Sequence, residues 1–385
     1  MNTRNLYLEG LRGILAIIVV IHHFILLFIP KLFIGSFNVT DFKTNPYSLD
    51  ILLANTPLNI FMNGGWAVCM FFTLSGFVLS LKYFKSADTK VIQGAIAKRY
   101  LRLAIPILAS CLLIFLLHFS GLFKNTFYPR SHEEYSFGKN LFLNDLSFFE
   151  TIKMALFNVP INGDNTYFPI LWTMEVEFLG ALLLFVFLLS VHQLKSKWIF
   201  YAAIILVLFL MNKNYIILFF AGSFIACYED KIKILFRSVY LKTLILIVGF
   251  YFAGIPNLQN EAKQYTIYAF TNYFSAFIYL QFHIISCFLF FLFLVSSEFP
   301  KKMLSNKGLL FLGKNSFSIY LIHLPVLFIV GSYFLNKTAG KINYLLLFGI
   351  CFSVTIILSY AFYYLIDSKA VLYANKLAKR LIKIN

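Results

Sequence analysis

Apolar stretches repeated along the whole chain restrict its possible folds more than any other feature. Marking runs of about 17 to 25 mostly apolar residues, the length that crosses a bilayer as a helix, gives ten candidate spans. Their approximate bounds are 10–30, 60–82, 101–120, 168–191, 197–212, 214–228, 239–256, 273–297, 308–333 and 343–366. The chain is 60% hydrophobic and 13% charged, whereas soluble domains are about 45–50% apolar and about 25% charged. We therefore expect an all-α, polytopic membrane protein, a bundle of about ten transmembrane helices.

The basic residues predict how these spans are oriented. Ten spans place both termini on one side, and 23 of the 33 lysines and arginines fall on that side. Because the side richer in lysine and arginine is cytoplasmic, we expect both termini in the cytoplasm. The excess of positive charge on this side has two possible explanations. It orients the helices and attracts anionic lipid, or some of it binds a polyanionic cytosolic substrate. We expect one transmembrane domain over residues 1–385, with 121–167 as an outer loop or interfacial segment.

The first span carries an arginine and a histidine inside an otherwise apolar run, EGLRGILAIIVVIHHF at residues 9–24. Arg12 and His23 are eleven positions apart, so at 100° per residue they point in one direction, about 16 Å apart along the axis. Ala16, Val19 and Val20 form a small-sided strip between them. Such residues inside a span usually face a cavity or the bundle interior. Alternatively, Arg12 snorkels to the cytoplasmic surface and His23 hydrogen-bonds a neighbouring helix.

This pair suits a donor with a charged head and a long reactive arm. A guanidinium at the cytoplasmic mouth can bind phosphate, and a neutral imidazole at depth can take a proton from a hydroxyl or a thiol. Acyl-coenzyme A has a polyphosphate head and a flexible arm that ends in a thioester. The spacing of Arg12 and His23 is therefore compatible with acyl-coenzyme A as a substrate.

Four further polar elements occur in or beside predicted spans. They are Ser75 with Gly76 in the second span, Arg99 and Arg102 before the third, Trp172, Glu175 and Glu177 at the outer end of the fourth, and Ser316, Tyr320 and His323 in the ninth. In this order, together with Arg12 and His23, they resemble the membrane-bound acyltransferase-3 family, whose members transfer acyl groups, usually acetyl, at the bacterial envelope. The resemblance extends from Leu6 to about Leu365.

The resemblance implies a role for each of these residues. His23 and Glu177 are the expected catalytic residues, with His23 as the base and Glu177 orienting it or contacting the acceptor. The expected donor-binding residues are Arg12, Ser75, Arg99 and Arg102, and the expected acceptor-binding residues are Trp172, Glu175, Tyr320 and His323. The blander interpretations are positive-inside anchoring for the arginines and helix-to-helix packing for the others. We interpret His22, His118 and His283 as structural.

The resemblance also predicts substrates and location. We expect an O-acyltransferase in a bacterial plasma membrane that moves an acyl group, in particular acetyl, from acyl-coenzyme A to a hydroxyl of an envelope polysaccharide, its lipid-linked precursor or another glycoside. We expect no metal, no bound cofactor and no nucleic-acid partner, with membrane lipid around the chain. The alternative is a carrier whose buried histidines and carboxylates couple proton movement to transport of a small solute. The oligomeric state is undecided.

Overall fold

Long apolar runs become long helices in the computed structural model of the protein. The structure describes residues 6–29, 32, 49–123, 147–256, 266–274 and 276–382. Within these ranges all regular elements are helical and there is no strand. Seven of the helices are long and apolar enough to cross a bilayer: Leu6–Phe28, Gly64–Ser86, Thr89–Phe119, Pro169–Ser190, Tyr279–Ser296, Ser316–Lys337 and Tyr344–Ile382. The described part of the chain is thus all-helical, and its long apolar helices indicate a multi-pass membrane protein.

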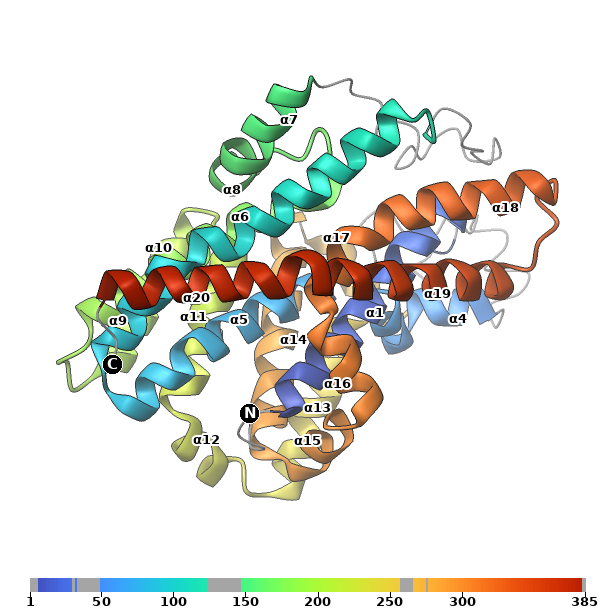
Figure 1. Ribbon diagram of the computed structural model, residues 1–385. Helices are drawn as coiled ribbons and strands as arrows, with labels where there is room; N and C mark the ends of the chain where they lie inside the picture. The colour runs from blue at the N-terminus through green and yellow to red at the C-terminus, as the bar shows by residue number, and fades with distance from the viewer. Residues whose placement is uncertain are drawn as a thin grey trace. The chain divides into compact units, whose positions relative to one another are not determined.

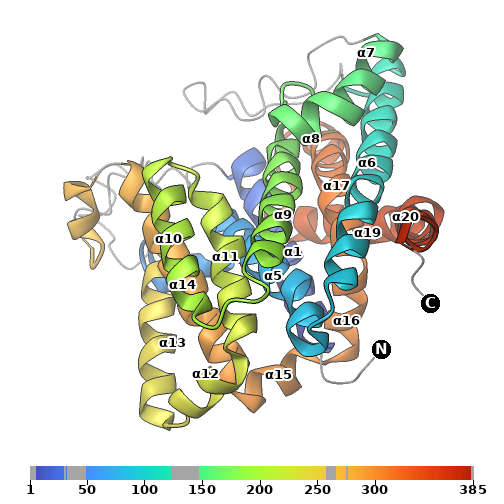
Figure 2. The same cartoon turned by 90° about the vertical axis from the view of Figure 1, so that its left-hand side faces the viewer.

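Three of the ten predicted spans are shorter in the structure than a bilayer requires. Helices α10 (Lys197–Leu210) and α11 (Asn214–Cys227) have 14 residues each, which is about 21 Å at 1.5 Å per residue. Helix α13 (Val239–Ala253) meets α12 (Glu229–Leu235) at an angle of 108° (Figure 2). Counting that bent pair as one span gives at most eight spans in the described ranges. A count of ten is therefore not confirmed.

The predicted ninth span combines two separate helices. Helix α16 (Lys307–Lys314) ends before α17 (Ser316–Val326) begins, so the apolar run over 308–333 is interrupted at Asn315. Helix α16 instead packs closely against α1 (Leu6–Phe28). The approach is so close that a Cβ atom added at Gly313 would lie 1.8 Å from the carbonyl oxygen of Glu9. The span itself begins at Ser316. Hydropathy alone merged the two helices because both are apolar.

The chain forms two units, each assembled from two separate stretches of sequence. Unit 1 comprises Met1–Phe84 and Leu194–Lys314, and unit 2 comprises Lys85–Gln193 and Asn315–Asn385. A single domain over 1–385 stays a prediction. The predicted outer segment, 121–167, belongs to unit 2, and its residues 124–146 lie outside the described ranges. Its remainder contains the short helices α7 (Phe148–Lys153), η4 (Met154–Asn158) and α8 (Val159–Asn162).

In unit 1, glycines let two helices cross at backbone contact. Helix α5 (Gly64–Ser86) crosses α11, and a Cβ at Gly76 would lie 2.0 Å from the carbonyl oxygen of Phe219. A Cβ at Gly222 would lie 2.0 Å from the carbonyl oxygen of Thr73. Close approach through small residues is typical of helix packing in membranes. The Leu-Ser-Gly-Phe element around Ser75 therefore has a packing function through its glycine.

We expect Gly76→Ala to destabilise the protein. The added methyl would meet backbone rather than a movable side chain, so α5 and α11 must shift apart, which typically costs about 1–3 kcal/mol of the free energy of unfolding. Thermal unfolding in detergent measures this effect. Gly349→Ala is the matched control, because nothing lies within 4 Å of a Cβ at that helical position. If both variants unfold at the wild-type temperature, the backbone contact at Gly76 is not tight.

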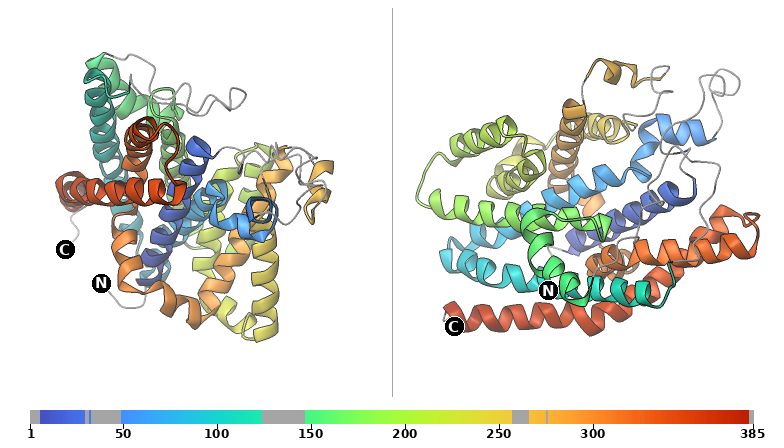
Figure 3. Two further views of the ribbon diagram at one scale, coloured as in Figure 1. Left: turned by 90° about the vertical axis from the view of Figure 1, so that its right-hand side faces the viewer. Right: turned by 90° about the horizontal axis from the view of Figure 1, so that it is seen from above.

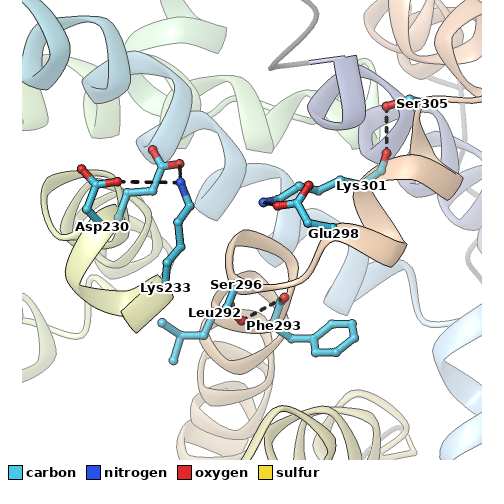
Figure 4. A network of polar contacts seen from close by, with 9 residues as sticks. Asp230, Lys233, Leu292, Phe293, Ser296, Glu298, Lys301 and Ser305 are labelled. Carbon is cyan, nitrogen blue, oxygen red and sulfur yellow. Dashed lines mark hydrogen bonds and ion pairs between the residues drawn. The ribbon is translucent and has the colours of Figure 1, made fainter. Parts of the chain in front are cut away.

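Two short helices of unit 1 carry ion pairs between their own residues. In α12, Lys233 pairs with Glu229 and lies 3.9 Å from Asp230 (Figure 4). In α15 (Glu298–Leu304), Lys301 Nζ lies 2.7 Å from the Glu298 carboxylate and 5.8 Å from the ring centre of Tyr7 in α1. The contact of Lys301 with Tyr7 links α15 to the first turn of α1, the helix that carries Arg12 and His23.

Unit 2 is organised around the 31-residue helix α6 (Thr89–Phe119). The short helices α7 and η4 and helix α9 (Trp172–Ser190) pack against it, and α8 packs on α9. A continuous helical run formed by α19 (Tyr344–Phe362), η9 (Tyr363–Asp367) and α20 (Ser368–Ile382) makes one long rod (Figures 1 and 3). Helix α20 packs on α6 and buries Ala370, Ala374 and Ala378 on one face. The predicted tenth span, 343–366, therefore continues as helix to Ile382.

Candidate active site

The imidazole of His23 is held by its own helix. Its Nδ1 lies 3.0 Å from the carbonyl oxygen of Val19, four residues earlier in α1. A carbonyl oxygen can only accept, so Nδ1 carries a proton and donates it to Val19. In the neutral ring, the lone pair therefore belongs to Nε2. A base needs a lone pair and a fixed orientation, and this hydrogen bond provides both for His23.

The N-terminal end of the same helix carries Arg12 in an ion pair. Its guanidinium lies 2.6 Å from the carboxylate of Glu9, and both side chains remain about one quarter exposed. Along the strip between Arg12 and His23, Ala16 is 3% exposed, Val19 2% and Val20 0%. Among the described residues, this strip is packed rather than lined by water-sized space. The shared direction of the two side chains does not, by itself, form an open path along this face.

Arg99 and Glu177, predicted at opposite ends of their spans, are in direct contact. One guanidinium nitrogen of Arg99 lies 2.6 Å from the Glu177 carboxylate and 2.7 Å from its backbone carbonyl oxygen. The two side chains are 8% and 18% exposed. Helix α6 starts at Thr89 rather than near 101, so Arg99 lies about 15 Å along the helix. The placement of Arg99 at the cytoplasmic surface and of Glu177 at the outer end is thus wrong for at least one of them.

Arg102, one turn further along α6, faces a different carboxylate. It interacts electrostatically with Asp367 in the π-helical turn η9, and Ser318 of α17 lies beside the same carboxylate. Asp367 is only 6% exposed. The two arginines of the Arg-x-x-Arg element are therefore assigned to two acidic partners, Glu177 and Asp367. Asp367 was missed because it follows the last apolar run.

The hydroxyl of Tyr320 joins α17 to the start of α9. It donates to the carbonyl oxygen of Ile170 and lies 2.7 Å from the hydroxyl of Thr173. Thr173 and Glu177 are four residues apart, so one face of α9 contacts both α17 and α6. His323, three residues after Tyr320, is 0% exposed and directs Nδ1 at the carbonyl oxygen of Ile319, 3.0 Å away. Tyr320 and His323 thus have protein partners at the positions predicted to bind acceptor.

A tight turn lies against Glu175 at the start of α9. Gly163 has a φ of +66°, a left-handed conformation that favours glycine, and a Cβ there would lie 2.3 Å from the Glu175 carboxylate. Burial alone would raise the pKa of the neighbouring Asp164, but hydrogen bonds from the amide and hydroxyl of Thr166 and from Asn158 lower it below its usual value. Asp164 therefore stays charged and holds the turn. Trp172, half-buried, opens the same helix.

Each unit thus contributes a different kind of chemistry. Unit 1 has an oriented imidazole, His23, on the helix that also carries Arg12, and the half-buried hydroxyl of Ser75. Unit 2 has a buried guanidinium–carboxylate pair, Arg99 with Glu177. In the described ranges, no three His, Cys, Asp or Glu side chains lie close enough together to hold a metal ion. The groups present can move a proton and bind anionic or hydroxyl-bearing groups.

Comparison with known proteins agrees with this chemistry. The family described as "Acyltransferase domain" matches residues 5–364. A relative named "Acyltransferase R4", from Phoma sp., is 24% identical over 455 aligned positions that cover 98% of this chain and 96% of the relative. No solved structure matches the chain. Because the family match covers nearly its whole length, the chain belongs to the membrane-bound acyltransferase-3 family.

Proposed function

We propose that the protein transfers an acyl group, in particular acetyl, from acyl-coenzyme A to a hydroxyl of an envelope glycan, its lipid-linked precursor or another glycoside. The observation that carries this proposal is the orientation of His23, whose Nδ1–H donates to Val19 and whose Nε2 bears the lone pair of the neutral ring. Family membership supports acyl transfer as the reaction. We place the protein in a bacterial plasma membrane, with its basic side in the cytoplasm.

The proposed reaction is a direct transfer. Nε2 of His23 takes the proton of the acceptor hydroxyl while the hydroxyl oxygen attacks the carbonyl carbon of the thioester. The carbon–sulfur bond breaks, and the thiolate of coenzyme A takes the proton from the imidazolium of His23. The products are an ester and a free thiol, and the imidazole is neutral again. General-base catalysis of this kind contributes about 10²–10⁴-fold to the rate.

The other site residues have proposed roles in binding. We assign the polyanionic donor to Arg12 and Arg102, with Ser75 near its arm, because guanidinium groups bind phosphates bidentately. Arg99 stays a proposed donor ligand as well, and it also positions the Glu177 carboxylate with which it pairs. We assign the acceptor to unit 2. Its proposed ligands are Glu177, Glu175 and Trp172, together with Tyr320 and His323. Carboxylates that accept hydrogen bonds from hydroxyls and an aromatic face suit a sugar.

Membranes containing the protein test this function. Supplied with labelled acetyl-coenzyme A, they should release free thiol and label the glycan fraction in equal amounts. A carrier would instead move a solute together with protons and leave the thioester intact. Folded protein in membranes that contain the native acceptor, with no thiol release above the empty membrane, would exclude acyl-coenzyme A as the donor.

A further inference from the structure

His22, next to the proposed base, is fixed by contacts outside its own helix. Its Nδ1 lies 2.9 Å from the carbonyl oxygen of Met62, forty residues away in the segment that precedes α5. The ring also covers Gly64, where an added Cβ would lie 2.5 Å from two ring carbons. Position 64 therefore has to be glycine while the ring stays in place. The imidazole of His22 is held between the Met62 carbonyl and the backbone of Gly64.

The segment that holds His22 is itself anchored by Asn63. The amide nitrogen of Asn63 donates to the carbonyl oxygen of Ala253, at 3.0 Å, and to Nε2 of His283, also at 3.0 Å. Its amide oxygen accepts the backbone N–H of Trp66, so Asn63 caps α5. Both donors and the acceptor of this buried amide are used. Residues 62–64 are thereby tied to α13 and to α14 (Ala276–Ser296), which lie side by side (Figure 2).

These contacts constrain the ring of His23. The two imidazoles are consecutive on α1, with ring centres 5.3 Å apart and planes at 79°. The hydrogen bond from His23 to Val19 lies within α1, so it moves with the helix. By contrast, the contact from His22 to Met62 leaves α1 and ties this turn of the helix to the segment that precedes α5. A rotation of α1 that breaks the contact of His22 also redirects Nε2 of His23.

We infer that His22 is a positioning residue for the acyl transfer, acting through the carbonyl of Met62, with Gly64 and Asn63 as its supports. The inference rests on the proposed role of His23 as the base. All the contacts that carry it lie within unit 1. A misplacement of about 1 Å can cost about 10²-fold in rate, so a helix rotation has a large effect on turnover. This gives His22 a part in the reaction beyond packing.

Two substitutions at position 22 test the inference. His22→Asn keeps an N–H donor at the place of Nδ1, whereas His22→Leu keeps the bulk and removes the donor. With the purified full chain in liposomes, acetyl-coenzyme A as the donor and the glycan acceptor present, we expect His22→Leu to lower kcat by at least 10-fold with an unchanged KM for the donor. We expect His22→Asn to stay within about 3-fold of the wild-type kcat. Both variants should have the same unfolding temperature. If His22 had a purely structural role, the loss of kcat in His22→Leu would instead be accompanied by a lower unfolding temperature.

A second pair of variants tests the same contact from the other side. Gly64→Ala displaces the ring of His22 and should lower kcat in the same way. Gly65→Ala is the matched control, because its nearest neighbour would lie at an ordinary 3.4 Å. Wild-type kcat in folded His22→Leu and Gly64→Ala would overturn the inference, as would equal losses in His22→Asn and His22→Leu. If the wild type itself releases no thiol from acetyl-coenzyme A in the presence of the glycan acceptor, the proposed function fails and this inference fails with it.

Discussion

His23→Ala should lower kcat for acyl transfer by about 10²–10⁴-fold, the range that a positioned general base contributes. The loss should appear in kcat rather than in the KM for the donor, because the ring takes a proton from the acceptor and does not bind phosphate. Folding should survive, since the hydrogen bond of His23 joins two residues of the same helix. Initial rates of thiol release in liposomes measure the effect.

A control separates loss of the base from loss of a histidine in general. His118→Ala removes a histidine near the end of α6, in unit 2, and should leave kcat within about 2-fold of wild type. A folded His23→Ala variant with wild-type kcat would remove His23 from the mechanism. A loss that appears only as a higher KM for the donor would assign His23 to binding instead.

Glu177→Gln should be the most destabilising single substitution that we consider. It leaves the guanidinium of Arg99 buried, 8% exposed, without its counter-charge. Removing one partner of a buried ion pair typically costs about 3–5 kcal/mol, because the remaining charge is no longer compensated. We therefore expect a large fall in unfolding temperature and loss of transfer activity.

A double-mutant cycle identifies the cause. Arg99→Met combined with Glu177→Gln should be more stable than the sum of the single effects predicts, because the double variant leaves no isolated charge. Glu298→Gln is the control, since that carboxylate is 88% exposed in its pair with Lys301 and such pairs contribute about 0–1 kcal/mol. Additive effects of Arg99→Met and Glu177→Gln would show that the two side chains do not interact in the membrane.

The sequence predicts the positions of the helices better than it predicts how many of them cross the membrane. Hydropathy locates apolar runs but does not measure the length of unbroken helix. The run over 197–228 contains a turn at residues 211–213, where Asn212 adopts a left-handed φ of 58°, so it forms two helices of 14 residues. The spans on either side of this turn are too short for the bilayer thickness assumed in the count.

Hydropathy does not predict the pairing of Arg99 with Glu177, because the apolar run that marks the third span begins at residue 101. Lys98 and Arg99 precede that run, and Arg102 is its second residue. In the structure α6 begins at Thr89 and carries both arginines along its length, where carboxylates compensate them. Charged side chains tolerated inside a span usually pair with one another. The sequence feature that indicates such a pairing is Glu177, a carboxylate inside the next span.

The orientation of His23 illustrates the opposite case. The sequence places an imidazole inside a span, but the ring nitrogen that carries the proton depends on a contact with the backbone. The carbonyl four residues earlier fixes the tautomer, and His323 makes the same contact with Ile319. Likewise, the anchoring of residues 62–64 through Asn63 needs contacts over about 190 and 220 residues, with Ala253 and His283. Neither the tautomer of His23 nor the long-range contacts of Asn63 produce a repeating pattern in the sequence, so sequence analysis does not predict them.

Acceptor dependence of thiol release tests the central claim most directly, namely that His23 acts as a base in a direct transfer. The purified protein is mixed with labelled acetyl-coenzyme A in liposomes, with and without a glycan acceptor, and free thiol and label on the protein are followed together. We predict thiol release only when acceptor is present, one thiol per acylated hydroxyl, and no label on the protein. A burst of thiol without acceptor, matched by label on His23, would contradict the claim.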